Sequence, residues 1–325
     1  MAKKILSIGE ATLDSFMFLH DANVRCTIDK AKCEFCMNYA DKILADQLVF
    51  SVGGNAANTA VTFARFGFTS QLYSAIGSDW VAEKIEKDLT AEGIDCAYFQ
   101  RQSGPTSYAT ALVFQEERNL VIYHVPRDYV LPDFEIVDWV YLTSMGKSFI
   151  GAYDKALSFA KQNKIGISFN PGSYQLKAGV DKIKHIIAQT ELLFVNKEEA
   201  RILTELPTSA NIRKLSEALY DLGAKIVNIT DGPEGAYCFD GSQLLFCPIF
   251  PIKVVERTGA GDSYASAFTA AYINGKSLDE AMRWGMANSA GVIAEIGPQK
   301  GILTPESLEE VLSKNSEIQP QRSKL

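Results

Sequence analysis

The feature that most constrains this chain is the alternation of short apolar, β-rich runs with amphipathic helical patterns. The β-rich runs lie at Ile5–Ile8, Gln71–Ala75, Val137–Leu142, Ile165–Phe169, Leu192–Val195 and Lys225–Ile229. Between two of these runs, helical spacing over Gly151–Asn163 brings four apolar side chains to one face. Buried strands that alternate with amphipathic helices predict an α/β fold, with a mostly parallel central sheet covered on both faces.

Two segments interrupt this rhythm, at about residues 16–50 and 97–125. The first holds strand-like alternation where a helix would be expected. The second reads as two strands, Tyr108–Phe114 and Leu120–His124, joined by the polar turn Gln115–Asn119. We expect the two segments to form a small accessory sheet that projects from the main domain.

The rest of the chain indicates a single unit. We expect one domain over residues 1–312 with the two accessory segments inserted, followed by a polar tail at 313–325 that frays. The content of 47% hydrophobic and 22% charged residues is that of an ordinary globular protein with enough apolar material for a large core.

Charge and hydropathy limit the partners of this chain. A net charge of -7 argues against nucleic acid and anionic membranes as partners. No stretch approaches the roughly 20 apolar residues of a membrane span. Ser7 and Gly9 break the apolar stretch near the N-terminus too early for a signal peptide. We therefore expect a cytoplasmic protein.

The cysteines allow two interpretations. In the cytoplasm all six are expected to be reduced, namely Cys26, Cys33, Cys36, Cys96, Cys238 and Cys247. The first three lie close together, and zinc would need a fourth ligand, for which His20 is the nearest candidate. They are either three thiols in a small sheet or loop region, or a metal or redox site.

The stretch RTGAGDSYASAF at 257–268 is the first of four motifs that can carry chemistry. Gly259, Ala260 and Gly261 allow backbone N–H groups to converge on an anion. The helix that follows adds free N–H groups and the positive end of its dipole. Asp262 either caps this helix or accepts a proton from an attacking hydroxyl.

Two better-known phosphate motifs do not fit. The two GKS sequences, which begin at Gly146 and Gly275, lack the upstream glycine of a P-loop, because Tyr141 and Ala270 stand there. A dinucleotide fingerprint that begins at Gly259 would need a third glycine at the position of Tyr264.

The second motif is the turn Ser51–Asn58. Gly53 and Gly54 permit a sharp connection from strand to helix. The amides of Asn55 and Asn58 can donate to and accept from sugar hydroxyls. The alternative is an asparagine-rich helix start without a ligand.

The third and fourth motifs follow buried strands. Asn196 and Glu199 share a face of an opening helix and offer the oxygen ligands that suit Mg²⁺, although this spacing is common by chance. The turn Ile229–Ala236 can pass close beneath a nucleotide or form a plain hairpin.

In this order along the chain, the four motifs resemble those of the PfkB (ribokinase-like) family of carbohydrate and nucleoside kinases. The resemblance covers residues 1 to about 310 and includes Gly9-Glu10 with Asp14, and Ile76–Trp80 ahead of Gly93-Ile94-Asp95. It implies a three-layer α/β/α domain with a small β-sheet lid, to which the two interrupting segments correspond. Lid strands in this family often pair between subunits, so the resemblance also implies a homodimer through the lid.

The resemblance also implies roles for individual residues. Asp262 would be the general base, and the backbone of Gly259, Ala260 and Gly261 would form an anion hole for the transferred phosphate of ATP. The other implied roles are acceptor contacts at Asp14, Gly54, Asn55 and Asn58, nucleotide contacts at Thr230, Gly232 and Gly235, and organisation of Mg²⁺ by Asn196 and Glu199.

Some positions depart from the family pattern or carry no fixed role. Glu256 and Arg257 replace the usual Asp-Thr before the glycine turn, which leaves dependence on a monovalent cation such as K⁺ open. Arg118 either reaches a phosphate or is a solvated turn residue. Asn170 either faces the cleft or belongs to an Asn-Pro turn.

Three functions are compatible with these motifs. The first is ATP-dependent phosphorylation of a small sugar at a primary hydroxyl (CH₂OH). The second is a nucleoside kinase, in which a lid aromatic residue stacks on the base; the residues available for this are Phe16, Phe18, Tyr108 and Tyr123. The third is a non-catalytic sugar-binding regulator, which the intact Asp262 argues against. Lid side chains set the acceptor, and no motif specifies them.

Overall fold

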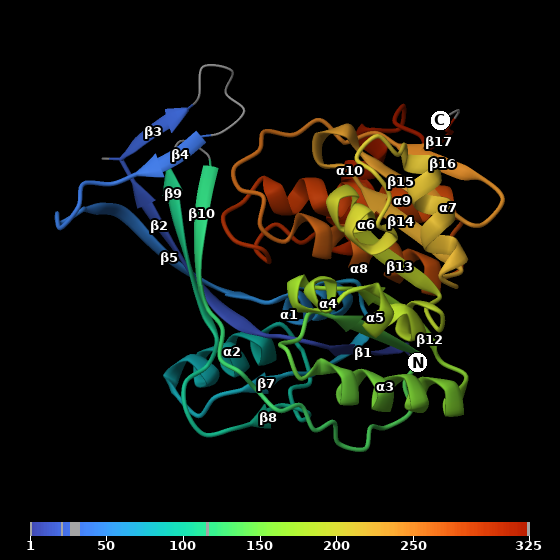
Figure 1. Cartoon of the computed structure of the whole chain (residues 1–325), viewed down its shortest axis with the longest axis horizontal. Coiled ribbons are helices and arrows are strands. Elements are labelled where there is room, and N and C mark those ends of the chain that lie inside the picture. Colours follow the sequence, from blue (N-terminus) through green and yellow to red (C-terminus); the bar gives the residue numbers. More distant parts are fainter. Residues whose placement is uncertain (1, 21, 27–32, 115–116, 324–325) are drawn as a thin grey trace.

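A nine-stranded sheet lies at the centre of the computed structural model, which describes residues 2–20, 22–26, 33–114 and 117–323 (Figure 1). Its parallel part, in spatial order, is β6 (Thr69–Tyr73), β1 (Lys4–Ile8), β11 (Trp139–Thr143), β12 (Gly166–Asn170), β13 (Leu192–Asn196) and β14 (Ile226–Thr230). The antiparallel strands β15 (Ala236–Phe239), β16 (Leu244–Cys247) and β17 (Gln321–Arg322) continue one edge. Each predicted β-rich run overlaps a strand of this sheet, but Ala75, the last residue of one run, belongs to the separate short strand β7 (Ala75–Ile76).

Helices cover both faces of the sheet, because neighbouring strand residues face opposite layers. Leu6 and Ile8 of β1 belong to one core and Ile5 to the other. The first layer holds α3 (Phe149–Asn163), α5 (Val180–Ile187), α6 (Lys197–Thr204) and α7 (Ile212–Asp221). The second holds α1 (Asn55–Arg65), α8 (Ala260–Ile273), α9 (Leu278–Ile293) and α10 (Pro305–Lys314). The expected α/β/α architecture is confirmed.

A second sheet of four strands projects from this body (Figure 1). We call it the lid; its order is β10 (Glu117–Tyr123), β9 (Tyr108–Phe114), β2 (Thr12–Leu19) and β5 (Ala45–Gly53). The ribbon of β3 (Asn23–Cys26) and β4 (Cys33–Cys36) lies at its far end. Both interrupting segments therefore contribute to one accessory sheet, as expected. The expected turn Gln115–Asn119 is shorter than predicted, since β10 already begins at Glu117, and residues 115–116 lie outside the described part.

Two expectations are wrong in part. The tail does not fray over Gln321–Arg322, because these residues pair with Leu245–Phe246 of β16 and extend the sheet. Cys26 is disulfide-bonded, so it is not the expected thiol, and the register places it opposite Cys33. Cys36, Cys96, Cys238 and Cys247 are free thiols.

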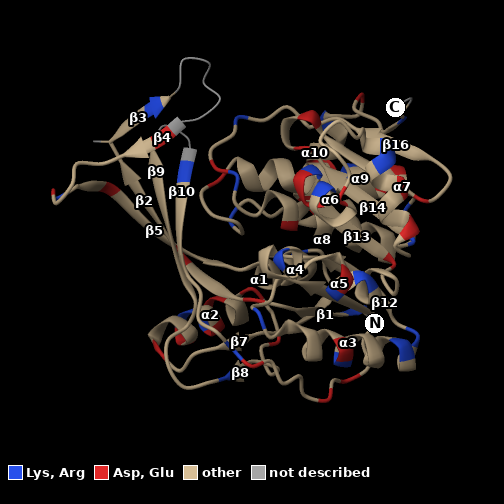
Figure 2. Cartoon of the chain, viewed as in Figure 1, with Lys and Arg blue, Asp and Glu red and all other residues tan. Residues whose placement is uncertain are grey.

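The surface of the described residues mixes charges of both signs. Figure 2 shows acidic and basic residues interspersed along the helices and loops. His20, the nearest candidate for a fourth zinc ligand, is bonded through Nδ1 to Asp46 at 2.6 Å. Within the described residues, none of the helices is long and apolar enough to cross a membrane.

Candidate active site

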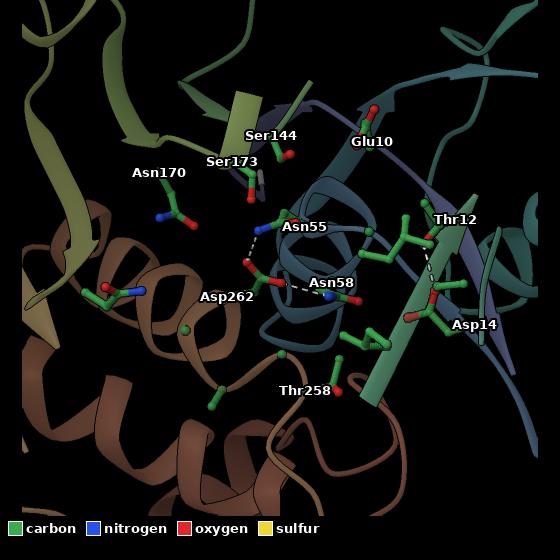
Figure 3. Close-up of a pocket in the computed structure, with 18 of the residues that line it drawn as sticks. Glu10, Thr12, Asp14, Asn55, Asn58, Ser144, Asn170, Ser173, Thr258 and Asp262 are labelled. Atoms are coloured by element: carbon green, nitrogen blue, oxygen red, sulfur yellow. Dashed lines mark hydrogen bonds between the residues drawn. The ribbon is translucent and has the colours of Figure 1, made fainter. Parts of the chain in front are cut away.

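A cavity of about 590 Å³ with a mixed polar and apolar lining lies between the lid and the carboxyl ends of the parallel strands. Its wall includes most of the residues singled out above: Asp14, Gly54, Asn55, Asn58, Asn196, Glu199, Thr230, Gly259, Ala260, Gly261 and Asp262. Figure 3 shows Asp262 between the two asparagines, with Asp14 farther along the same cavity. The structure thus brings together motifs that are far apart in the sequence.

Asp262 is a buried carboxylate held by two amides. The Nδ2 groups of Asn55 and Asn58 donate to its two oxygens at 2.9 and 2.8 Å. The helix N-cap is Gly259, and no side-chain cap bond forms there, so Asp262 does not cap the helix. Burial raises the pKa of Asp262 to about 7, the two amides lower it, and the charge of Glu199 raises it. A carboxylate with this pKa is suited to accept a proton near neutral pH.

The turn before α8 needs glycine. Gly259 has a φ of 78°, and a Cβ there would lie 2.6 Å from Cβ of Pro298. The first backbone N–H groups of a helix have no intrahelical acceptor, so this turn brings donors and the positive end of the helix dipole to the cavity wall; the Ala260 N–H also bonds to the Arg257 carbonyl at 3.4 Å. The arrangement can bind an anion beside the carboxylate of Asp262.

The lid side of the cavity is built around Asp14 in β2. The Thr12 hydroxyl donates to Asp14 at 3.0 Å. A Cβ on Gly53 would lie 2.2 Å from a carboxylate oxygen of Asp14, so glycine makes room for this side chain. Burial raises the pKa of Asp14 to about 6. Gly54 has a φ of 89° and starts α1, which carries the two asparagines.

The structure gives Asn55 and Asn58 a role beyond the expected acceptor contacts. Both amides are turned to Asp262, and Oδ1 of Asn58 also accepts from Nε2 of Gln299 at 3.1 Å. Asn58 is almost completely buried. These residues therefore orient the carboxylate, and the sugar-binding role predicted for them stays a prediction.

Asn196 and Glu199 form a capping box at the start of α6. Oδ1 of Asn196 accepts from the Glu199 backbone N–H at 2.9 Å, and Oε2 of Glu199 accepts from that of Asn196 at 2.8 Å. This contact explains the spacing without a metal. Both residues still line the cavity, and burial raises the pKa of Glu199. The described residues contain no cluster of three His, Cys, Asp or Glu side chains that could hold a metal.

The nucleotide motif is only partly in the cavity wall. Thr230, at the end of β14, lines it. Gly232 and Gly235 do not; Gly232 begins the short 3₁₀ turn Gly232–Glu234, and Gly235 follows it. Gly235 has a φ of 107°, and a Cβ there would meet the backbone oxygen of Cys247 at 2.4 Å. The structure thus explains Gly235 by tight packing of this turn.

A further cluster of polar side chains, for which no role was predicted, lies around Glu10 and His124 in the cavity wall. Oε1 of Glu10 is 3.2 Å from Nε2 of His124 and accepts from the Tyr129 hydroxyl at 3.3 Å. Burial raises the pKa of Glu10 to about 7 and lowers that of His124. Tyr174 packs against the His124 ring, with ring centroids 4.8 Å apart. The sequence signal for this cluster is the position of Glu10, which follows the first predicted strand and precedes Asp14 by four residues.

Several residues left open above now have positions. Asn170 faces the cavity, and its amide donates to the Phe194 carbonyl. Arg118 is not a solvated turn residue, because it lies within β10 and pairs with Glu256 at 2.7 Å. The exposed Arg257 lines the cavity. Of the four lid aromatics considered for stacking, Tyr108 lines the cavity.

A doubly covered parallel sheet, a lid and a buried carboxylate in the first turn of a helix are the arrangement that the resemblance to a kinase family implies. Residues 15–305 match the family model described as "pfkB family carbohydrate kinase". The chain belongs to this family and is a phosphotransferase with an alcohol group as acceptor.

Individual relatives agree with this membership. A ribokinase of Haemophilus influenzae is 27% identical over 270 residues, which cover 80% of this chain and 87% of the relative. The solved ribokinase of Arabidopsis thaliana, complexed with ribose and ATP, has a TM-score of 0.77 at 21% identity and covers 96% of this chain and 99% of its own. A nucleoside kinase of Methanocaldococcus jannaschii has a TM-score of 0.75 at 23% identity, with 97% and 100% covered. The fold is ribokinase-like.

Proposed function

We propose that this enzyme transfers the γ-phosphoryl group of ATP to a primary hydroxyl of a small sugar, with Asp262 as general base. The observation that carries the proposal is the Asp262 carboxylate. It is buried, held by two asparagine amides, and placed at the start of α8 beside Gly259–Gly261 in the cavity wall. The third hypothesis, a non-catalytic regulator, does not fit a member of a kinase family that retains this group.

The geometry suggests a division of labour. Asp14 accepts hydrogen bonds from acceptor hydroxyls and so directs one hydroxyl toward Asp262. Asp262 removes the proton of that hydroxyl as the oxygen attacks phosphorus. The backbone N–H groups at Gly259, Ala260 and Gly261 stabilise the charge on the phosphate oxygens. The lid excludes water, which would otherwise compete as acceptor.

The donor end of the cavity fits a nucleotide that carries Mg²⁺. We propose that Glu199, with Asn196 beside it, contacts the ion through water, while Thr230 lines the nucleotide side with Gly232 and Gly235. Mg²⁺ keeps several waters and takes its other ligands from phosphates, so a single protein carboxylate suits it. The described residues contain no larger acidic cluster that could hold a metal. When bound, the ion would neutralise phosphate charge near Asp262.

A nucleoside acceptor is the second candidate, because Tyr108 offers an aromatic ring in the cavity wall and a nucleoside kinase shares the fold. A panel of pentoses, hexoses, sugar phosphates and nucleosides, with ATP consumption as readout, separates the two. We expect turnover with one free sugar, dependent on Mg²⁺ and abolished by EDTA. Turnover with nucleosides alone would move the assignment to the second candidate, and no turnover with any acceptor would contradict the proposal.

We also propose that two copies pair through the lid. Side chains that alternate with the cavity-facing ones are large, apolar and exposed: Leu48 (50%), Phe50 (43%), Val121 (61%) and Tyr123 (57%). A sheet face and an edge strand of this kind are typical of interaction surfaces. Sedimentation velocity should give a dimer, and Val121→Glu with Tyr123→Glu should give a monomer. A monomeric wild type at micromolar concentration would contradict this.

A further inference from the structure

An ion pair connects the lid to the turn that precedes α8. Arg118 lies in β10, the edge strand of the lid, and its Nη1 is 2.7 Å from Oε1 of Glu256. The side chains are 23% and 4% exposed, so the pair is largely withdrawn from water. Arg118 and Glu256 are 138 positions apart in the chain, so the pair joins two distant segments. A solvated surface pair would tell little about function, whereas a buried pair fixes its two elements relative to each other.

Glu256 also contacts Thr258, the residue before the anion-binding turn Gly259–Gly261. Its Oε1 also accepts from the backbone N–H of Thr258 at 2.8 Å and from the Thr258 hydroxyl at 2.6 Å. Thr258 directly precedes Gly259, whose backbone must hold a φ of 78° for the turn to present its N–H groups. The backbone N–H of Glu256 is itself bonded to the Ile293 carbonyl at the end of α9. The carboxylate of Glu256 therefore fixes the turn from one side.

The pair is incomplete in this structure. Nε of Arg118 and Oε2 of Glu256 are both buried, and neither has a hydrogen-bond partner among the described residues. One is a donor and the other an acceptor. The Nε–H points away from Nη1, so a two-point contact requires the guanidinium to turn until Nε and Nη2 face the two carboxylate oxygens. Unpartnered buried groups of this kind favour a rearrangement that pairs them. Arg118 lies on an edge strand of the sheet that projects from the body (Figure 1).

We propose that Arg118 and Glu256 are positioning residues that couple closure of the lid to the geometry of the anion-binding turn. Closure over an acceptor completes the two-point contact, and the contact holds Thr258 and Gly259 in the conformation that receives the phosphoryl group. The proposal rests on the function proposed above for Gly259–Gly261. The Glu256 carboxylate also lies near Asp14, whose pKa it raises and Arg118 lowers, so the pair adjoins the acceptor side as well.

A double-mutant cycle tests the coupling. Arg118→Met leaves Glu256 buried and unpaired, so kcat with the acceptor found in the panel should fall by about tenfold or more while KM for ATP changes little. Glu256→Gln should cost less. The double variant Arg118→Met/Glu256→Gln should be more active than Arg118→Met alone, because no charge is then stranded. Arg118→Lys should recover part of the activity. Arg25→Met, which removes an exposed charge from β3, is the matched control and should match the wild type.

Hydrogen exchange gives a readout that does not depend on turnover. In Arg118→Met, amides of residues 254–260 and of β10 should exchange faster, while exchange in α3 and α7 stays unchanged. Three results would each overturn the proposal. They are effects on kcat that simply multiply in the double variant, a kcat of Arg118→Met within twofold of wild type, and faster exchange over the whole molecule. If the panel yields no acceptor, the proposed function fails, and the exchange arm still decides whether the lid and the turn are coupled.

Discussion

Asp262→Asn should reduce kcat by about 10²–10⁴-fold, the usual contribution of a positioned general base. The amide keeps the shape of the side chain but cannot take the proton of the acceptor hydroxyl. The wall formed by Asp14 on one side and Thr230 on the other is unchanged, so KM for both substrates should stay within a fewfold of wild type. Steady-state kinetics with the acceptor from the panel measures both quantities.

The matched control is Asp279→Asn. Asp279 is also in the first turn of a helix, α9, but it is exposed and lies outside the cavity wall. It should retain wild-type kcat. Retention of more than about a tenth of the activity in Asp262→Asn would contradict the general-base role, since a base worth at least 10²-fold cannot be removed at so small a cost.

The same residue predicts the acidic limb of the pH profile. Burial raises the pKa of Asp262 to about 7, and only the ionised form can accept a proton. We therefore expect kcat/KM to fall as the pH drops below about 7, roughly tenfold per pH unit at the acid end. Glu10→Gln should keep this limb, although the pKa of Glu10 is also about 7, because Glu10 belongs to the end of the cavity that we propose for the acceptor and makes no bond to Asp262 among the described contacts. Loss of the limb in Glu10→Gln would move the titration to that residue.

Asp14→Ala should raise KM for the acceptor by about 10- to 100-fold, because a hydrogen bond to a charged group contributes roughly 1.5–3 kcal/mol. Asp14 lies among lid residues near the start of α1, whereas Thr230 and Glu199 belong to the end that we propose for the nucleotide. KM for ATP should therefore change little. Acceptor titrations at saturating ATP, and the reverse, separate the two constants.

Asp46→Ala provides the control within the same sheet. Asp46 lies in β5 of the lid and pairs with His20 at an exposed position. Its loss should leave both KM values unchanged. If Asp14→Ala instead weakens ATP binding and leaves the acceptor unaffected, the assignment of the two ends of the cavity is reversed.

The architecture was largely predictable because it depends on local patterns. Each apolar run such as Leu192–Val195 predicts a buried strand. The spacing of apolar residues over 151–163 predicts a helix whose apolar face packs on the sheet. The lid followed from two segments that lacked this alternation. The disulfide at Cys26 and the short strand at Gln321–Arg322 were missed, since both depend on a partner strand that local sequence does not reveal.

For the candidate site, the residues that belong to it were predictable, but the contacts between them were not. The turn Gly259–Asp262, the pair Asn55 and Asn58, and Asp14 could be selected because their residue types and backbone requirements limit what they do. Their contacts could not be selected. The amide of Asn55 meets Asp262 across 207 positions of sequence, and no spacing rule encodes a contact of that range.

The sequence by itself determined the layered α/β core, the lid segments, and the family to which its ordered motifs belong, because these depend on periodicity and on short turns with strict backbone needs. Only the tertiary structure decided which groups touch. It turned the two asparagines onto Asp262, placed Glu10 against His124, and set Arg118 of the lid against Glu256. The physical reason is that burial and hydrogen bonding depend on how distant strands and helices pack. Burial and hydrogen bonds set the pKa of Asp262, and the packing of the lid against the body brings Arg118 to Glu256.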